Sequence, residues 1–197
     1  GYCYYPYPNN PNHVFLRPLF IGIDSSFKEK WVKPFYALDT ILGWANSIIP
    51  VNDSVLMGVG IRKLEGNKDN SLLAFINVDG EELGYAQITN EQIGPEIKDN
   101  VIINIERIND TLFIAAANFG EETSVNPAGE LVIDTDGNLY NFQSRPYTHK
   151  KPSMVKTYDN NFVIATNKKI GNYFELYLYK INAKLESVPF DTTQYVY

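Results

Sequence analysis

Hydrophobic and polar positions alternate over short runs along most of the chain, and polar turns separate the runs, which is typical of β-strands joined by tight turns. Three stretches have similar sequences, in which a turn of Asn and Asp is followed by large apolar residues and then by Gly or Ala. They read VNDSVLMGVG from Val51, INDTLFIAAA from Ile108 and YDNNFVIATN from Tyr158. A chain that repeats itself in this way is expected to fold as copies of one unit.

A second motif, consisting of a strand, a turn and another strand, follows each copy of the first. The three copies read SLLAFINVDGEELGYAQI, GELVIDTDGNLYNF and FELYLYKINAKLESVPF, and VFLRPLFIGIDSSFKEKWVKPF near the N-terminus carries this motif without a clear first one. Asp-Gly between such runs predicts a hairpin, because Gly supplies the positive φ of a tight turn. Aligning the turns places in register Asp24, Asp79, Asp136 and Asn182, which are 55, 57 and 46 residues apart.

One more short strand precedes each first motif, in ANSIIPV, NVIINIERI and SMVKTY. Four strands in about 50 residues, repeated, predict an all-β fold of antiparallel β-propeller blades. The chain is expected to form one propeller-type domain over residues 1–197, or part of one. Its predicted units are a partial blade and three blades, over residues 1–36, 37–90, 99–145 and 152–192. About three and a half blades are fewer than the roughly 4 to 8 of closed propellers, which predicts a fragment of a larger propeller.

Small residues recur in the second strand of each unit, at Gly58, Gly60, Ala115–Ala117 and Ala165. They suit inner positions where blades converge, although a β-sandwich could also place them by chance. The segment KPFYALDTILGWANSI has some helical spacing but is expected to be a loop or a single helical turn between blades. The longest irregular segments are expected at the N-terminus as far as Asn12, at Leu64–Asn70 and at Gly120–Gly129.

Composition narrows the classes of function. The chain is 44% hydrophobic and 14% aromatic, which favours a folded, strand-rich domain. Its net charge of −6 argues against a nucleic-acid partner, which requires a basic surface. No apolar run approaches the roughly 20 residues of a membrane-spanning helix. Cys3 is the only cysteine, so the chain forms no internal disulfide.

The third unit resembles the blades of a family of bacterial propellers. Asp159–Thr166 is similar to a DGGFIIAG-like strand and Tyr177–Asn182 to a YLYKLN-like strand, whereas WD40 and kelch repeats are not closely similar. Such blades occur in large secreted or surface proteins of the Bacteroidetes, many of them exported by the type IX secretion system. The ending SVPFDTTQYVY is similar to the segment that precedes a sorting domain in those proteins. The resemblance implies a location on the extracellular side of the outer membrane.

Two groups of residues are candidates for binding. Asp134, Asp136 and Asn138 alternate around a Gly in a spacing that can wrap oxygen ligands around Ca²⁺, although the turn alone also explains them. Tyr2, Tyr4, Tyr5 and Tyr7 form a Tyr/Pro segment that is expected to be an exposed loop. Such a loop suits stacking on sugars or docking on a partner, and the alternative is an extended segment packed against other blades.

No catalytic motif stands out. GVG at Gly58–Gly60 lacks the third Gly of a dinucleotide site, His13 and His149 have no partner at metal-ligand spacing, and the acid pairs Glu81–Glu82 and Glu121–Glu122 are best explained as a solvated face. The expected function is a non-catalytic binding scaffold, without a cofactor unless calcium binds, whose partner is a protein or glycan at the bacterial surface. The alternatives are a polysaccharide-active propeller enzyme with carboxylates near a central channel, and a component or cargo of an outer-membrane secretion assembly.

Overall fold

The regular secondary structure of the computed structural model is almost entirely strand, in four antiparallel sheets of three or four strands each. This confirms the all-β prediction. The residues that the structure describes are 1–7, 10–36, 43–63, 69–94, 97, 99–120, 127–148, 152–170 and 172–190. The segment KPFYALDTILGWANSI, predicted to be a loop or a single helical turn between blades, lies partly outside them. Leu64–Lys68 and His149 also lie outside the described residues.

The first sheet is built around one long strand. It contains β1 (Tyr2–Tyr7), β2 (Asn10–Ile23) and β3 (Glu29–Pro34). The first half of β2 pairs with β1 and the second half pairs with β3. The expectation of an irregular N-terminus was therefore wrong. Tyr is a good strand former, and Pro6 is tolerated because β1 is an edge strand.

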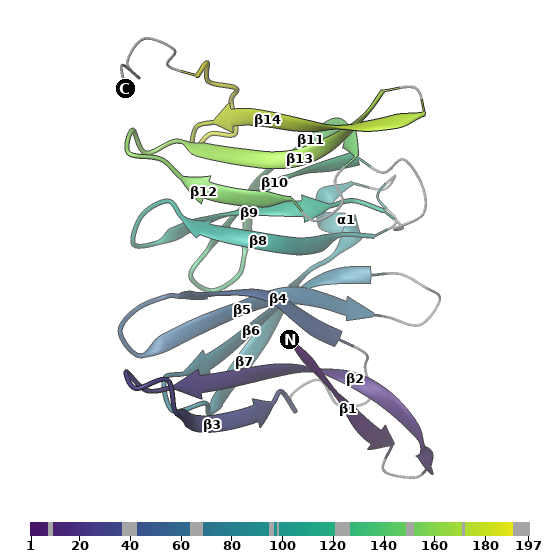
Figure 1. Cartoon of the computed structure of the whole chain (residues 1–197), viewed down its shortest axis with the longest axis vertical. Helices are drawn as coiled ribbons and strands as arrows, with labels where there is room; N and C mark the ends of the chain where they lie inside the picture. The colour runs from purple at the N-terminus through teal and green to yellow at the C-terminus, as the bar shows by residue number, and fades with distance from the viewer. Residues whose placement is uncertain are drawn as a thin grey trace.

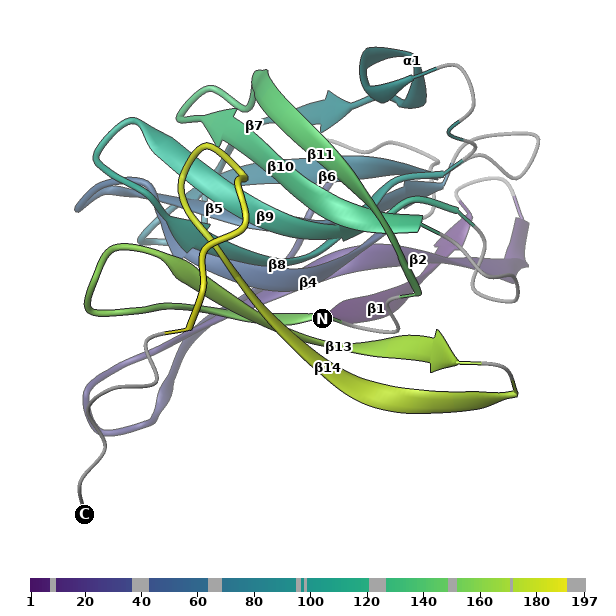
Figure 2. The ribbon, with the colours of Figure 1, turned by 90° about the horizontal axis from the view of Figure 1, so that it is seen from above.

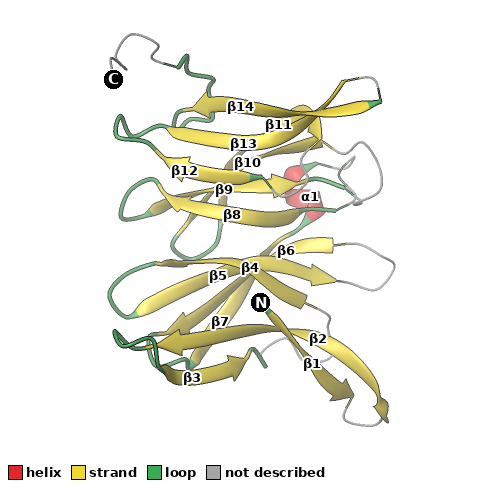
Figure 3. Cartoon of the chain, viewed as in Figure 1, coloured by secondary structure: helices red, strands yellow, loops and turns green. Residues whose placement is uncertain are grey.

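The second and third sheets have four strands each, in the order of the chain. The second contains β4 (Gly43–Pro50), β5 (Val55–Lys63), β6 (Asp69–Asn77) and β7 (Glu82–Ile88). A short helix, α1 (Asn90–Ile93), leads to the third sheet, as the red segment in Figure 3 shows. That sheet contains β8 (Val101–Arg107), β9 (Leu112–Asn118), β10 (Pro127–Asp134) and β11 (Leu139–Thr148).

The fourth sheet has three strands, β12 (Ser153–Lys156), β13 (Phe162–Ile170) and β14 (Tyr173–Ile181). A fourth strand was predicted in LESVPF. The structure has only an isolated bridge there, between Ile181 and Ser187. Within the described residues, no helix is long and apolar enough to cross a membrane.

The four sheets lie face to face in chain order, from the purple first sheet to the yellow-green fourth in Figure 1, and Figure 2 looks along this stack. We call the face of a sheet that looks toward the preceding sheet its N-side face, and the opposite one its C-side face. In β6, Leu72, Ala74 and Ile76 lie on the N-side face and pack in a cluster with Phe20 of the first sheet. Leu73 lies on the C-side face and packs toward the third sheet. Strand alternation therefore supplies both buried faces of a middle sheet.

Close packing explains the small residues of the second strands, against the preceding sheet at Gly58 and against the neighbouring strand β4 of the same sheet at Gly60. A Cβ added at Gly58 would lie 2.3 Å from the Phe20 ring, and one at Gly60 would lie 1.9 Å from the carbonyl oxygen of Trp44. Ala115 and Ala116 are fully buried on opposite faces of β9, in the clusters that join the third sheet to the second and to the fourth. The first and fourth sheets lie at opposite ends of the stack, which is open between them (Figure 1).

Candidate interaction surfaces

One five-residue turn recurs in all four sheets. Its first residue accepts hydrogen bonds at its side-chain oxygen from the backbone N–H groups two and four residues later, at 2.8 to 3.1 Å. The first residues of the four turns are Asp24, Asn77, Asp134 and Asn182. They are 53, 57 and 48 residues apart in the sequence. The predicted register was therefore wrong by two residues at Asp79 and Asp136, which follow the capping residue rather than replace it.

The fourth residue of each turn has a positive φ, namely Phe27, Gly80, Gly137 and Leu185, at 59°, 80°, 85° and 68°. Gly adopts this left-handed conformation without strain, whereas Phe and Leu do not. The two middle sheets therefore have the relaxed version of the turn, and the two end sheets have the strained one.

The turns of the first motif are of two kinds. Asn52 and Asn109 cap equivalent turns, each accepting from backbone N–H groups two and three residues later. The third copy instead spans Thr157–Asn161, with Asn160 at a positive φ of 57°. The resemblance between the three copies is thus closer in sequence than in turn geometry.

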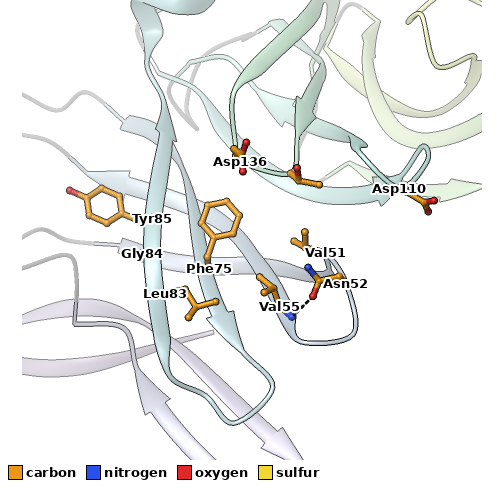
Figure 4. Close-up of a pocket in the computed structure, with 10 residues that line it drawn as sticks. Val51, Asn52, Val55, Phe75, Leu83, Gly84, Tyr85, Asp110 and Asp136 are labelled. Carbon is orange, nitrogen blue, oxygen red and sulfur yellow. Dashed lines mark hydrogen bonds between the residues drawn. The ribbon is translucent and has the colours of Figure 1, made fainter.

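A groove lies between the turns of the second and third sheets, with a cavity volume of about 590 Å³. Its apolar part is formed by Val51, Val55, Phe75 and Leu83, and Asp110 and Asp136 lie on the side of the third sheet. Figure 4 shows Phe75 pointing from β6 toward the turn that carries Asp136, while Tyr85 points away. A Cβ at Gly84 would meet nothing within 4 Å, so the missing side chain leaves this edge of β7 open.

Of the residues predicted to bind calcium, Asp136 lines this groove, and Asp134 and Asn138 are hydrogen-bonded to each other within the same turn. Asp134 Oδ1 accepts from the N–H groups of Asp136 and Asn138, and Oδ2 accepts from Asn138 Nδ2 at 3.0 Å. Burial raises the pKa of Asp134 in part, but these hydrogen bonds outweigh it and hold the pKa below its usual value. Among the described residues, no three His, Cys, Asp or Glu side chains lie close enough together to hold a metal ion. Calcium binding stays a prediction.

The predicted tyrosine contacts lie on β1. Tyr2 and Tyr4 are exposed and meet edge to face, with ring centroids 5.9 Å apart. Tyr5 instead packs inward against Phe15 and Tyr36, and the buried Arg17 guanidinium lies 4.6 to 5.1 Å from the three ring centroids. Of the four predicted contact residues, Tyr2 and Tyr4 are thus available to a partner, Tyr5 supports the fold, and the Tyr7 side chain lies outside the described part.

A buried carboxylate joins the third sheet to the fourth. Glu130 accepts hydrogen bonds from Arg145 Nε at 2.8 Å and from the Tyr179 hydroxyl at 2.5 Å, and Arg145 also donates to the carbonyl of Leu185. Burial raises the pKa of Glu130, while Tyr179 and Arg145 oppose the shift. Sequence reasoning missed this group because its members are 15 to 49 residues apart.

The two ends of the stack expose apolar faces. The N-side face of the first sheet carries the cross-strand pairs Leu19–Pro34 and Ile21–Val32, together with Ile23. The C-side face of the fourth sheet carries Val155, Val163, Ala165 and Leu178. We call these the N-terminal end face and the C-terminal end face.

Comparing equivalent positions of the four sheets shows that this exposure is unusual for the repeat. The residue directly before each five-residue turn is Ile23, Ile76, Ile133 or Ile181, and all four are isoleucine. Their exposed fractions are 56%, 1%, 0% and 0%. Four residues before the turn, Phe20, Leu73 and Glu130 are buried, whereas Leu178 is 48% exposed. The repeated isoleucine is the signal in the sequence from which the end faces could have been found.

No family model matches the chain, and no curated protein matches it at a significant level.

Proposed function

We propose that the chain is a non-catalytic interaction scaffold of the β-propeller type, joined through its end faces to other sheets of the same kind. The single observation that carries this proposal is the exposed Ile23. The same residue at the same place in the other three sheets is buried by the sheet before it. Fully burying such a side chain contributes about 1.5–3 kcal/mol, so a face with several of them favours a covering partner.

The exposed apolar end face is the reason for assigning an interaction with another protein. Monomeric proteins rarely expose a contiguous apolar face, and such faces commonly mark sites of protein interaction. The resemblance of the third unit to surface propellers of the Bacteroidetes supports placing this interaction at the outside of a bacterial cell.

A fluorescent dye that binds apolar surface, such as anilinonaphthalene sulfonate, tests the proposal. The chain at sub-micromolar concentration is expected to enhance the dye's fluorescence, and the double variant Ile21→Lys and Ile23→Lys is expected to lose much of that signal while its circular dichroism is unchanged. A matched control, Tyr140→Lys, replaces an exposed ring away from both end faces. Equal signals from the variant and the wild type would overturn the proposal.

The groove supports a second candidate function, binding of a glycan. Phe75 offers an aromatic surface, and Asp110 and Asp136 offer acceptors for sugar hydroxyl groups. Cleavage of the bound sugar distinguishes the scaffold from the alternative, a polysaccharide-active enzyme. Both would bind sugar at this groove, but only the enzyme would cleave it.

Incubation with a neutral glucan, a xylan and a polygalacturonate distinguishes the two. The scaffold is expected to release no reducing ends from any of them. If it binds one of these polymers, the double variant Asp110→Asn and Asp136→Asn is expected to weaken binding. Release of reducing ends by the wild type, abolished in that variant, would contradict the non-catalytic assignment.

A further inference from the structure

We propose that the partner at the end faces is a second copy of this chain, packed head to tail. The C-terminal end face of one copy covers the N-terminal end face of the other. The inference rests on the proposed scaffold function and names the partner for it. The reason lies in the kind of face that each end sheet leaves uncovered.

Every internal interface of the stack joins a C-side face to the N-side face of the next sheet. Between the second and third sheets, Met57 and Leu73 meet Leu131 and Ile133 in one cluster. Between the third and fourth, Ile114 and Val132 meet Tyr179 and Ile181 in another. At both interfaces a C-side face packs against an N-side face, and the contacting residues occupy matching positions relative to the turns.

The sheets of the described residues leave one face of each kind uncovered. Its first sheet lacks a C-side face to pack on, and its fourth sheet presents one. The two sheets lie at opposite ends of the stack, so they do not cover each other within one copy (Figure 1). A second copy supplies both missing faces at once, and it continues an interface that the chain already builds.

The repeat also predicts which residues meet. Leu178 occupies the place of Leu73, four residues before the turn, and Val163 occupies the place of Met57 and Ile114 on the neighbouring strand. Ile21 and Ile23 occupy the places of Leu131 and Ile133. We therefore expect Leu178 and Val163 of one copy to pack on Ile21 and Ile23 of the other.

The charges on the two faces permit this contact. On the N-terminal end face, the pairs Leu19–Pro34 and Ile21–Val32 across β2 and β3 are apolar, whereas Ile23 is paired with the exposed Glu29. On the C-terminal end face, the nearly buried Lys180 ammonium is already paired with the Asp159 carboxylate, at 2.5 Å. Its charge is thus neutralised within the same copy.

Two copies joined at both ends would form a closed ring of eight sheets. Head-to-tail contacts generate a ring when the rotation closes and an open filament when it does not. Eight sheets lie at the upper end of the roughly 4 to 8 blades common in propellers, so the ring of two is the expected product.

Sedimentation equilibrium of the full chain over a range of concentrations tests the inference. The expected result is a mass twice that of the 197-residue chain, which falls to the single-chain mass on dilution. A chain that stays monomeric up to about 100 µM, a concentration at which any Kd in the micromolar range would show, overturns it. A series of larger polymers overturns the ring.

Two charge variants test the faces. Ile21→Asp and Leu178→Asp are each expected to weaken association at least about 30-fold, the effect typical of losing a central interface residue. Tyr140→Asp, in an exposed position of the third sheet, is the matched control and is expected to dimerise like the wild type. Circular dichroism establishes that each variant is folded, and Val32→Lys replaces Ile21→Asp if the latter is not.

Mixing the two variants tests the head-to-tail geometry. Ile21→Asp retains an intact C-terminal end face, and Leu178→Asp retains an intact N-terminal one, so an equimolar mixture is expected to recover a heterodimer through one good interface. A dimer that persists in both single variants, or a mixture that recovers nothing, overturns the geometry. If the wild type is monomeric but its end faces bind the dye, only the second copy is wrong, whereas a monomer that binds no dye contradicts the scaffold as well.

Discussion

The two middle sheets and the two end sheets have the same strand pattern but different surroundings. The second and third sheets bury both faces, whereas the first and fourth bury one and expose the other. The turns differ in the same way, since the middle sheets place Gly at the left-handed position and the end sheets place Phe27 and Leu185 there. Alternating apolar residues therefore allow a strand to be buried on both faces, and the position of its sheet in the stack decides whether both faces are buried.

The largest expected effect comes from the polar contact inside one of the sheet interfaces. Glu130→Leu leaves the Arg145 guanidinium and the Tyr179 hydroxyl without their shared acceptor, and is expected to cost about 3–5 kcal/mol of the free energy of unfolding in urea. Leu73 and Leu178 show that leucine fits this place in the repeat, so the loss would come from the broken polar contact. Adding Arg145→Leu should recover part of it, and a double variant no more stable than Glu130→Leu would contradict this account.

Glu130 also gives a pH dependence with a definite sign. Burial holds the pKa of Glu130 above its usual value, so the folded state keeps this proton at a higher pH than the unfolded state. The contribution of Glu130 to stability therefore falls as pH rises from about 4.3, the usual pKa of Glu, through the raised value. Urea titrations from pH 4 to 7 should show this fall in the wild type and not in the double variant. If the stability of the wild type and that of the double variant changed in parallel with pH, Glu130 would not be the source of the pH dependence.

A matched pair of isoleucines tests the comparison of middle and end sheets directly. Ile133→Ala in the third sheet opens a cavity in a fully buried cluster and is expected to cost about 2–5 kcal/mol. Ile23→Ala removes the same atoms at the same place in the first sheet, where they are exposed, and is expected to change the stability of the monomer by about 0.5 kcal/mol or less. Urea unfolding at a low protein concentration measures both. Equal losses would show that the first sheet is covered within a single copy.

The turns provide a fourth test, with smaller and opposite effects. Gly137→Ala places a Cβ 2.8 Å from Leu73 Cδ1 at a positive φ, and is expected to destabilise the chain by about 1–3 kcal/mol. Phe27→Gly relieves strain at an exposed position, and is expected to stabilise it by up to about 1 kcal/mol. Thermal unfolding should shift in opposite directions for the two variants. A loss of stability in Phe27→Gly would show that the Phe27 ring has a contact worth more than the strain.

Local patterns in the sequence predict the strands and hairpins well, because these depend on neighbouring residues. The Asp-Gly hairpins at Gly80 and Gly137 and the alternation of β6 are confirmed. The register of the turns was wrong because Asp-Gly was aligned instead of the capping residue, which is Asn77 in one copy and Asp134 in the next.

Features that depend on distant parts of the chain were out of reach of the sequence. The two prolines of the Tyr/Pro segment favour a loop, and its pairing with β2 along one edge is what makes it a strand despite Pro6. Arg17 is enclosed by rings from three separate segments. Ile23 is exposed because no sheet of the described residues lies on its face of the first sheet, whereas Ile76, at the same place before its turn, is buried against the first sheet.

The smallest expected effect separates the charge of a capping residue from its hydrogen bonds. Asp134→Asn keeps the oxygen that caps the turn, as Asn77 and Asn182 do in the equivalent turns, and is expected to change stability at pH 7 by about 0.5 kcal/mol or less. Because the pKa of Asp134 is held below its usual value, its charged form stabilises the fold above about pH 3.9, and this contribution is lost as pH falls through the lowered pKa. The difference in urea stability between wild type and Asp134→Asn should therefore shift in favour of the variant between pH 4 and pH 2. Asp134→Ala is the control, which loses the cap itself and should cost about 1 kcal/mol at every pH above that range. A difference that does not change with pH would mean that the cap acts through its shape alone.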